Sequence, residues 1–266
     1  MGCQKSLDFD LPPATGAHLS YYWTMDEAAD LNKLDSTVGQ SWNATTGNLS
    51  PPGKFVNGIQ LDNVFVGGVP FFHGLRNLAD PAFGFDAATS TGVSVCFWFN
   101  KTVDQTELPL TLFDFNIECH DAGYAIDAQL IITALFRPSD VANNWQIRHA
   151  DFSGGPDTSF LHTFLPVTGT WHMIAVTVDL GTQTLNFYID GSLVQSVPDP
   201  GLFHTAPLGD LVLKCSFGTA GNTLTILVDE LLLSLKGPLS PTQISNLYNA
   251  GVGKTWPNII PIVPYP

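Results

Sequence analysis

The stretch that decides the fold reads Thr168-Gly-Thr-Trp-His-Met-Ile-Ala-Val-Thr-Val178, and it is followed closely by Thr184-Leu-Asn-Phe-Tyr-Ile-Asp-Gly191. In the second part the apolar residues Leu185, Phe187 and Ile189 alternate with their neighbours, which is the period of a strand with one buried face. Asp190-Gly191 then separates this run from Ser-Leu-Val194. This pair predicts a two-residue hairpin with a type I′ turn, because both turn residues need positive φ.

The composition agrees with a β-rich protein. The chain has 266 residues, with Lys+Arg 10, Asp+Glu 24, a formal net charge of -14, and 13% charged against 44% hydrophobic residues. Long solvent-facing helices need Glu, Lys and Arg, and these are scarce here. With so few cations the chain cannot neutralise a run of phosphates, so we expect no nucleic-acid partner. An anionic membrane surface would repel it as well.

Outward from the hairpin, short apolar runs are separated by clusters of Gly, Pro, Asn and Asp. The clearest predicted strands cover residues 93–99, 171–179, 184–189, 210–217 and 224–235. One helix is predicted late in the chain. Ser240 is a good N-cap, Pro241 suits the first helical position, Gln243 completes a capping box, and Gly251 ends the helix. Ile244, Leu247 and Tyr248 form its apolar stripe.

These signals predict one domain over residues 18–250, preceded by a leader over residues 1–17 and followed by a proline-rich apolar arm over residues 251–266. The arm either lies along its own domain or docks on a neighbouring subunit. The leader shows no secretory signal, and no stretch approaches the roughly 18 apolar residues of a membrane helix. Met1-Gly-Cys-Gln-Lys-Ser6 matches an acylation pattern, whose alternative reading is a chance match.

Cysteine usage does not argue for a disulfide framework. The four cysteines are widely spaced, and no two of them form a C-x-x-C pair. Cys96 lies within the apolar run 93–99, where we expect it to act as a small buried hydrophobe.

Several motifs in order resemble one known fold. They are His18-Leu-Ser-Tyr-Tyr-Trp-Thr-Met-Asp-Glu27, Gly53-Lys-Phe-Val-Asn-Gly-Ile-Gln-Leu-Asp62, the central hairpin, Val228-Asp-Glu230, and Gly237-Pro-Leu-Ser-Pro-Thr-Gln-Ile-Ser-Asn-Leu-Tyr248. Together they resemble the laminin-G-like jelly roll of the concanavalin A-like lectin and glucanase superfamily. The resemblance implies an all-β, antiparallel β-sandwich jelly roll with one short C-terminal helix and an extended proline-rich tail.

The resemblance leaves catalysis to be argued from the residues. Hydrolases of this superfamily carry two or three carboxylates on one strand, typically Glu-x-Asp-x-Glu. In the run from Glu118 to Asp121, a histidine takes the place of the middle acid, and Glu107 lacks the pattern. Glu27 and Glu230 sit in Asp-Glu pairs whose members face opposite sides. We therefore expect no enzyme, with a degenerate glycoside hydrolase as the remaining alternative.

The resemblance also suggests a structural calcium ion between the opening and closing strands. The matching positions are Asp26, Glu27, Asp62 and Asp229, whose carboxylate oxygens suit Ca²⁺. The alternative is that these acids cap turns by accepting hydrogen bonds from backbone N–H groups.

Sugar recognition needs aromatic platforms together with Asp or Asn acceptors. Among the aromatic residues in loop-like contexts, we predict Trp42, Tyr124 and Trp145 as platforms, with Asp151 and Asp157 on a rim loop. The sequence thus predicts a non-catalytic recognition or assembly module whose partners are glycans or neighbouring protein subunits. The leading hypothesis is a viral (phage-like) surface or decoration protein with host glycans as candidate ligands. A lectin or adhesion module of a cellular surface or secreted protein is the alternative, and the predicted location is a virion surface or the extracellular space.

Overall fold

A computed structural model describes thirteen segments of the chain. These are residues 20–23, 44–46, 48–55, 57–66, 69–78, 91–102, 111–120, 126–136, 144–151, 157–199, 208–216, 225–234 and 237–254. The predicted leader lies outside these segments, as does the predicted arm beyond Lys254.

Strands dominate the described residues. In chain order they are β1 (Ser20–Trp23), β2 (Ala44–Thr46), β3 (Asn48–Pro52), β4 (Asn57–Val66), β5 (Val69–Leu78), β6 (Gly92–Lys101), β7 (Thr111–His120), β8 (Ile126–Phe136), β9 (Asn144–Asp151), β10 (Thr158–Thr163), β11 (Trp171–Asp179), β12 (Thr184–Ile189), β13 (Ser192–Pro198), β14 (Leu208–Ser216) and β15 (Thr225–Ser234). They are followed by α1 (Pro241–Tyr248) and a 3₁₀ turn, η2 (Asn249–Gly251).

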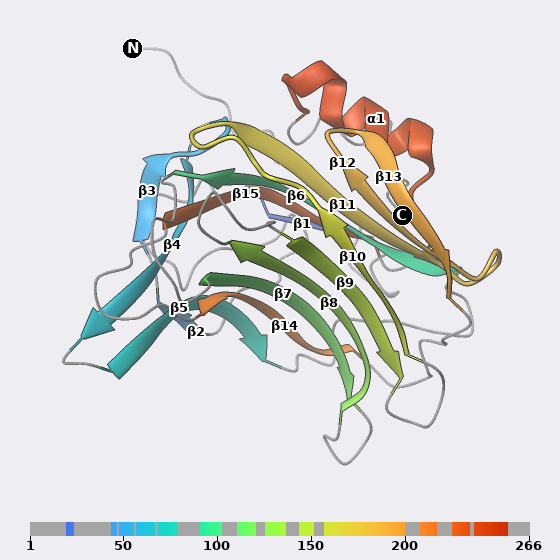
Figure 1. The fold of residues 1–266 in the computed structure, drawn as a ribbon, viewed down its shortest axis with the longest axis horizontal. Coiled ribbons are helices and arrows are strands. Elements are labelled where there is room, and N and C mark those ends of the chain that lie inside the picture. Colours follow the sequence, from blue (N-terminus) through green and yellow to red (C-terminus); the bar gives the residue numbers. More distant parts are fainter. Residues whose placement is uncertain are drawn as a thin grey trace, which may run out of the picture.

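The strands form two antiparallel layers (Figure 1). Layer 1 has the order β3-β4-β15-β6-β11-β12-β13, with β1 beside β15. Layer 2 has the order β10-β9-β8-β7-β14-β5, with β2 beside β5. The β4–β5 hairpin belongs to both layers and joins them at one side. This architecture confirms the predicted all-β sandwich with a short C-terminal helix.

The core between the layers follows from strand alternation. Along layer 1, alternate residues of β6 and β11 such as Phe97 and Val176 are buried and face layer 2. Trp145 on β9 meets them from layer 2, with its ring centroid 5.3 Å from that of Phe99 and 6.0 Å from that of Phe187. Aromatic rings from both layers therefore fill the space between the sheets.

The predicted hairpin is confirmed in detail. Asp190 and Gly191 have φ of 51° and 75°, as a type I′ turn requires, and they connect β12 to β13. Leu185, Phe187 and Ile189 are all buried. On the opposite face of β12, Asn186 lies opposite Thr177 of β11 and Ser196 of β13, and its side chain hydrogen-bonds to both.

Layer 1 is unusual in having a second apolar face, on the side away from layer 2. Cys96, Trp98, Met173, Tyr188 and Leu232 lie on this face, and helix α1 covers them with Ile244 and Leu247 (Figure 1). The predicted capping box is present, because Ser240 accepts a hydrogen bond from the backbone N–H of Gln243, whose side chain accepts one from the backbone N–H of Ser240.

The helix ends earlier than predicted. Its C-cap is Asn249 in the left-handed region, with φ of 47°, and the chain then turns through Ala250 and Gly251. Asn tolerates this conformation better than most residues, so it replaces glycine as the stop signal. The turn brings Gly253 against the rings of Phe55 and Trp98, where a Cβ atom would lie 2.5 Å and 2.8 Å from ring carbons.

Two glycines allow this close approach to be tested. Gly253 and Gly169 have nearly the same φ, 76° and 77°, but a Cβ on Gly169 would meet nothing within 4 Å. Gly169→Ala should lower the free energy of unfolding by about 1–2 kcal/mol, through left-handed strain alone. Gly253→Ala should cost about 1–3 kcal/mol more, because overpacking adds to the strain. Urea denaturation measures both, and equal losses would contradict the packing argument.

Candidate recognition face

The face of layer 2 that points away from layer 1 is the candidate functional surface. On β8, Leu130, Ile132 and Ala134 are buried against layer 1, so Gln129, Ile131 and Thr133 occupy positions on the opposite face. The same face continues on the neighbouring strands, since Ile131 pairs with Arg148 on β9 and with Asn116 on β7. We call these positions the recognition face: Asp114, Asn116, Glu118, Gln129, Ile131, Thr133, Gln146 and Arg148.

The centre of this face contains a pattern that the sequence reasoning missed. Asp114, Asn116 and Glu118 are alternate residues of β7, and they pair with Thr133, Ile131 and Gln129 of β8. They therefore belong to one face. The expectation for Glu118 rested only on the residues after it, whereas Asp114 and Asn116 precede it on the same strand. Because Asn116 is an amide, the three-carboxylate pattern of the hydrolases is still not present in β7. The spacing Asp-x-Asn-x-Glu was the available signal.

At the β9 edge of the recognition face the structure describes the side chains themselves. Arg148 on β9 forms an ion pair with Asp157, at the start of β10, and both side chains are partly exposed, at 37% and 43%. Gln146 is two residues before Arg148 on the same strand and is half-buried. Exposed ion pairs of this kind add little stability, so the guanidinium and carboxylate remain available to a ligand at small cost.

The predicted sugar-binding residues are not all brought together. Trp145 lies on β9 rather than in a loop, and its side chain is fully buried in the core. A ring enclosed on both faces cannot stack on a sugar, so its assignment as a platform is corrected. Asp157 does lie exposed beside Arg148. Asp151 ends β9, while Trp42 and Tyr124 lie outside the described residues, so their roles stay predictions.

Three histidines make side-chain contacts near this edge, two between the layers and one within layer 1. On β9 and β10 of layer 2, Nδ1 of His149 lies 2.8 Å from Oδ2 of Asp199, and Nδ1 of His162 lies 3.3 Å from Oε1 of Gln195. Gln195 belongs to β13 of layer 1, and Asp199 is the residue after this strand. We call these two contacts, together with that of the third histidine, the histidine ties.

The third histidine acts within layer 1. Nδ1 of His172 on β11 lies 2.8 Å from Oδ2 of Asp190, in the hairpin turn. The same carboxylate accepts a hydrogen bond from the backbone N–H of Met173. The ring of His172 also packs edge-on against Phe164, with 5.1 Å between centroids. This histidine tie therefore holds the turn of the β12–β13 hairpin to β11.

The predicted calcium ligand Asp229 has another role. Its side chain is fully buried, and Oδ2 accepts hydrogen bonds from the backbone N–H groups of Lys54 and Phe55, at 2.7 Å and 3.3 Å. Oδ1 accepts one from the backbone N–H of Glu230 at 2.9 Å. N–H donors thus face both oxygens, as the turn-capping alternative expects.

The described residues do not test the other three predicted calcium ligands. Asp26 and Glu27 lie outside the described residues, and Asp62 belongs to β4, where it pairs with Thr225. In the described part of the chain, no group of three or more His, Cys, Asp or Glu side chains is placed to hold a metal ion. Calcium binding stays a prediction.

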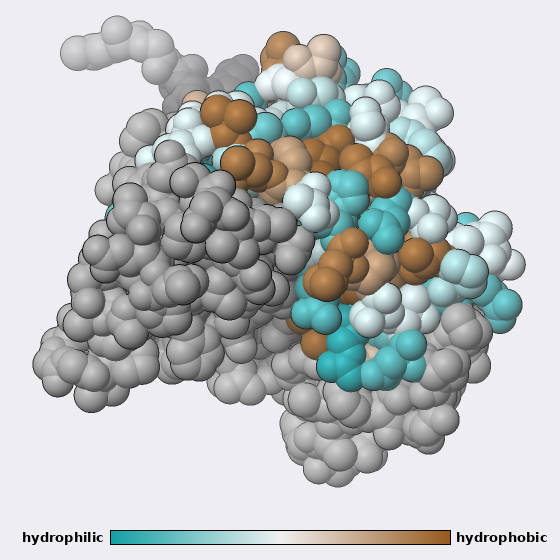
Figure 2. Space-filling model, viewed as in Figure 1, coloured by the Kyte–Doolittle hydropathy of each residue, from teal (hydrophilic) through white to brown (hydrophobic). Residues whose placement is uncertain are grey.

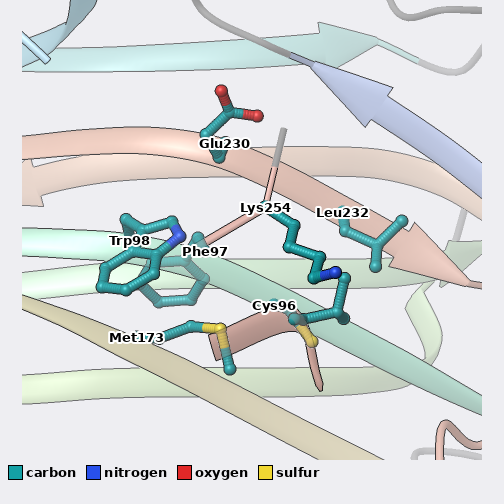
Figure 3. A pocket seen from close by; sticks show the side chains of 8 residues that line it. Cys96, Phe97, Trp98, Met173, Glu230, Leu232 and Lys254 are labelled. Atoms are coloured by element: carbon teal, nitrogen blue, oxygen red, sulfur yellow. The ribbon is translucent and has the colours of Figure 1, made fainter. Parts of the chain in front are cut away.

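Glu230 follows Asp229 in a distorted part of β15. Its φ is 54°, and the register between β15 and β6 shifts between Asp229 and Leu232. It lines a small cavity of about 20 Å³ under helix α1, together with Cys96 and Lys254. Figure 3 shows Lys254 extending beside Cys96, whereas the Glu230 carboxyl group points away from both.

Burial controls the protonation of two groups at this cavity. It raises the pKa of Glu230 to about 9 and that of Cys96 to about 12. Both side chains are therefore neutral at pH 7, because the charged forms lose their hydration. The buried, protonated Cys96 agrees with the prediction of a small hydrophobe.

The raised pKa of Glu230 predicts how stability depends on pH. Between pH 4.5, its ordinary pKa, and about 9, the folded state keeps a proton that the unfolded state has released. The free energy of unfolding therefore falls as pH rises through this window and levels off above it. Glu230→Gln removes this contribution, so the variant should gain stability relative to wild type from pH 5 to pH 9. Urea denaturation across this range measures the difference, and a constant difference would contradict a neutral Glu230.

Solved structures share this fold. The binding domain of Botulinum neurotoxin DC, in complex with rat synaptotagmin II, aligns with a TM-score of 0.62 at 12% identity, covering 90% of this chain and 52% of its own. A structure of botulinum neurotoxin type C, whose cell entry depends upon interaction with two ganglioside molecules, gives 0.61 at 12% identity with the same coverage. The binding domain of Paraclostridial Mosquitocidal Protein 1 gives 0.59 at 13% identity, covering 88% of this chain and 52% of its own.

This chain thus spans about half the length of each of these structures, and at such low identity the likeness concerns the fold. The sequence matches no curated protein. A family model does match: the model of the Concanavalin A-like lectin/glucanases superfamily of laminin G type covers residues 79–245, more than half of the chain. The match includes most of layer 2 and the central hairpin. The chain therefore belongs to the concanavalin A-like lectin/glucanases superfamily.

Proposed function

We propose that this protein is a non-catalytic recognition module that binds glycans through the recognition face. The observation that carries the proposal is the row of polar positions that runs across adjacent strands of layer 2, from Gln146 on β9 through Thr133 on β8 to Asp114 on β7, with Arg148 beside it. On layer 1, α1 packs on the outer surface over β6, β11, β12 and β15. Among the described residues no helix packs on layer 2, which favours this layer as the side that a ligand meets.

The chemistry of this face suits sugars. Carboxylate and amide oxygens accept hydrogen bonds from sugar hydroxyls, and a guanidinium donates to them or to a sugar carboxylate. The side chain of Arg148 is already oriented by Asp157, so less conformational entropy is lost on binding. The solved structures with this fold also favour recognition, since they are binding domains of toxins, one of them from a toxin that interacts with gangliosides.

The proposal also includes the location of the protein and a second class of partner. We keep a virion surface or the extracellular space as the predicted location, with neighbouring protein subunits as the other class of partner. Among the described residues no helix is both long enough and apolar enough to cross a membrane.

A glycan array followed by calorimetry tests the proposal. The full chain should bind at least one glycan saturably, and Arg148→Ala should weaken that binding at least tenfold, since a charge-assisted hydrogen bond is worth about 1.5–3 kcal/mol. Asn246→Ala is the matched control, because this residue is exposed on α1, beyond the other layer. Its binding should equal that of wild type.

Failure would take two forms. If the full chain binds no glycan on the array, glycan recognition is wrong. If the control loses binding as much as Arg148→Ala does, the ligand does not use the recognition face. Thermal unfolding of each variant shows whether the fold is retained.

A second candidate, glycoside hydrolysis, is favoured by the spacing of Asp114, Asn116 and Glu118 on β7. Two carboxylates on one face of a strand are what an acid/base and a nucleophile require. The middle position, however, holds an amide. A hydrolase should release reducing sugar from a panel of β-glucans and alginates, and Glu118→Gln should abolish the release. No release by wild type removes this candidate without affecting the binding proposal.

A further inference from the structure

The segment that follows the recognition face, residues 157–168, lies at the edge of layer 2 and exposes one side continuously. It comprises β10 and the extended residues after it. Buried or half-buried residues alternate with exposed ones along its whole length, from Thr158 and Phe160 to Phe164 and Pro166 on the inner side. An extended chain with period two presents all of its outer side chains to one side.

The outer side of this segment is apolar. Leu161, Leu165 and Val167 are 58%, 55% and 61% exposed, and we call these three side chains the edge stripe. Figure 2 shows hydrophobic side chains at the surface over β10, separated by a hydrophilic band from those over β12 and β13. Three large apolar side chains along one edge are more than the single exposed hydrophobes expected on a monomer surface.

Within the described residues, β10 is the last strand of layer 2. Among the described strands, β10 pairs only with β9, and it has neither a charged residue nor a bulge nor a proline. The corresponding edge strand of layer 1, β13, has a register shift opposite Phe187 and Tyr188 and ends in Pro198. Bulges, prolines and charges are the usual means of preventing edge strands from pairing, so β10 differs from β13 in lacking them.

Charge indicates which partner can approach. Two copies of a chain with net charge -14 repel each other wherever their acidic surfaces meet. Residues 158–178 contain no Asp, Glu, Lys or Arg, and this is the longest such run in the sequence. Antiparallel pairing of the edge with its own copy would therefore bring apolar side chains together without opposing like charges.

We propose that β10 and the edge stripe form a self-association surface, at which two copies of this chain pair edge to edge about a two-fold axis. Such a contact is isologous, since the same segment of each copy meets the other. It extends layer 2 from one copy into the next and buries the edge stripe of both. The edge stripe borders the recognition face, since Leu161 pairs with Gln146. The two proposals are nevertheless tested separately, because dimerisation is measured without any glycan.

Sedimentation velocity over a range of concentrations tests the proposal with the full chain. Wild type should form a dimer, and added salt should strengthen it by screening the acidic surfaces. Leu161→Glu and Leu165→Glu each place two like charges in the contact, so they should shift the midpoint of dimerisation to at least tenfold higher concentration. Val252→Glu is the matched control: this residue is 67% exposed, beyond α1, and its variant should dimerise like wild type.

Amide hydrogen exchange supplies the second readout. Backbone amides within Thr158–Thr163 should exchange more slowly in wild type at concentrations where the dimer forms, and this protection should be absent in Leu161→Glu. A monomer at every concentration and salt would overturn the proposal. So would a dimer that Leu161→Glu and Leu165→Glu leave intact, or one that Val252→Glu disrupts equally.

Discussion

The buried carboxylate of Asp229 accepts hydrogen bonds that join β15 to the turn before β4, and the rest of layer 1 depends on this junction. On one side β15 pairs with β6, with a register shift between Asp229 and Leu232; on the other it pairs with β4 up to Val228 and with β1 from Leu231. The change of neighbour coincides with this irregularity, at which Glu230 has positive φ. Because Asp229 also binds the backbone of Lys54 and Phe55, the turn into β4 is fixed at the same point.

That turn then orders the C-terminal part of the domain. Nζ of Lys54 lies 4.5 Å from the centroid of the Trp98 ring and donates a hydrogen bond to the carbonyl oxygen of Gly251. The ring of Tyr248 stacks on that of Trp98, with 5.8 Å between the ring centroids. The helix can therefore cover the second apolar face of layer 1, whereas no helix of the described residues covers layer 2. This difference between the two layers supports the proposal that a ligand binds at layer 2.

Features of the fold that depend on neighbouring residues could be predicted from the sequence. Contacts of the candidate site between residues far apart in the chain could not. The Asp190-Gly191 turn and the Ser240 cap depend on neighbouring residues, so the sequence showed them directly. Trp145 was placed in a loop because polar residues surround it, although its alternation with Ile147 and His149 indicated a strand. The histidine ties join residues 50, 33 and 18 positions apart, and no local pattern predicts which partner each ring meets.

The histidine ties have a mechanical consequence. Apolar packing between two sheets has no directional preference, so by itself it resists separation better than it resists sliding of one sheet over the other. A hydrogen bond is directional and weakens steeply when its donor and acceptor are displaced. The contacts of His149 with Asp199 and of His162 with Gln195 connect the two layers at separate points, on the side of the sandwich formed by β10 and β13. Two directional contacts at separate points oppose both shear and rotation of layer 2 against layer 1.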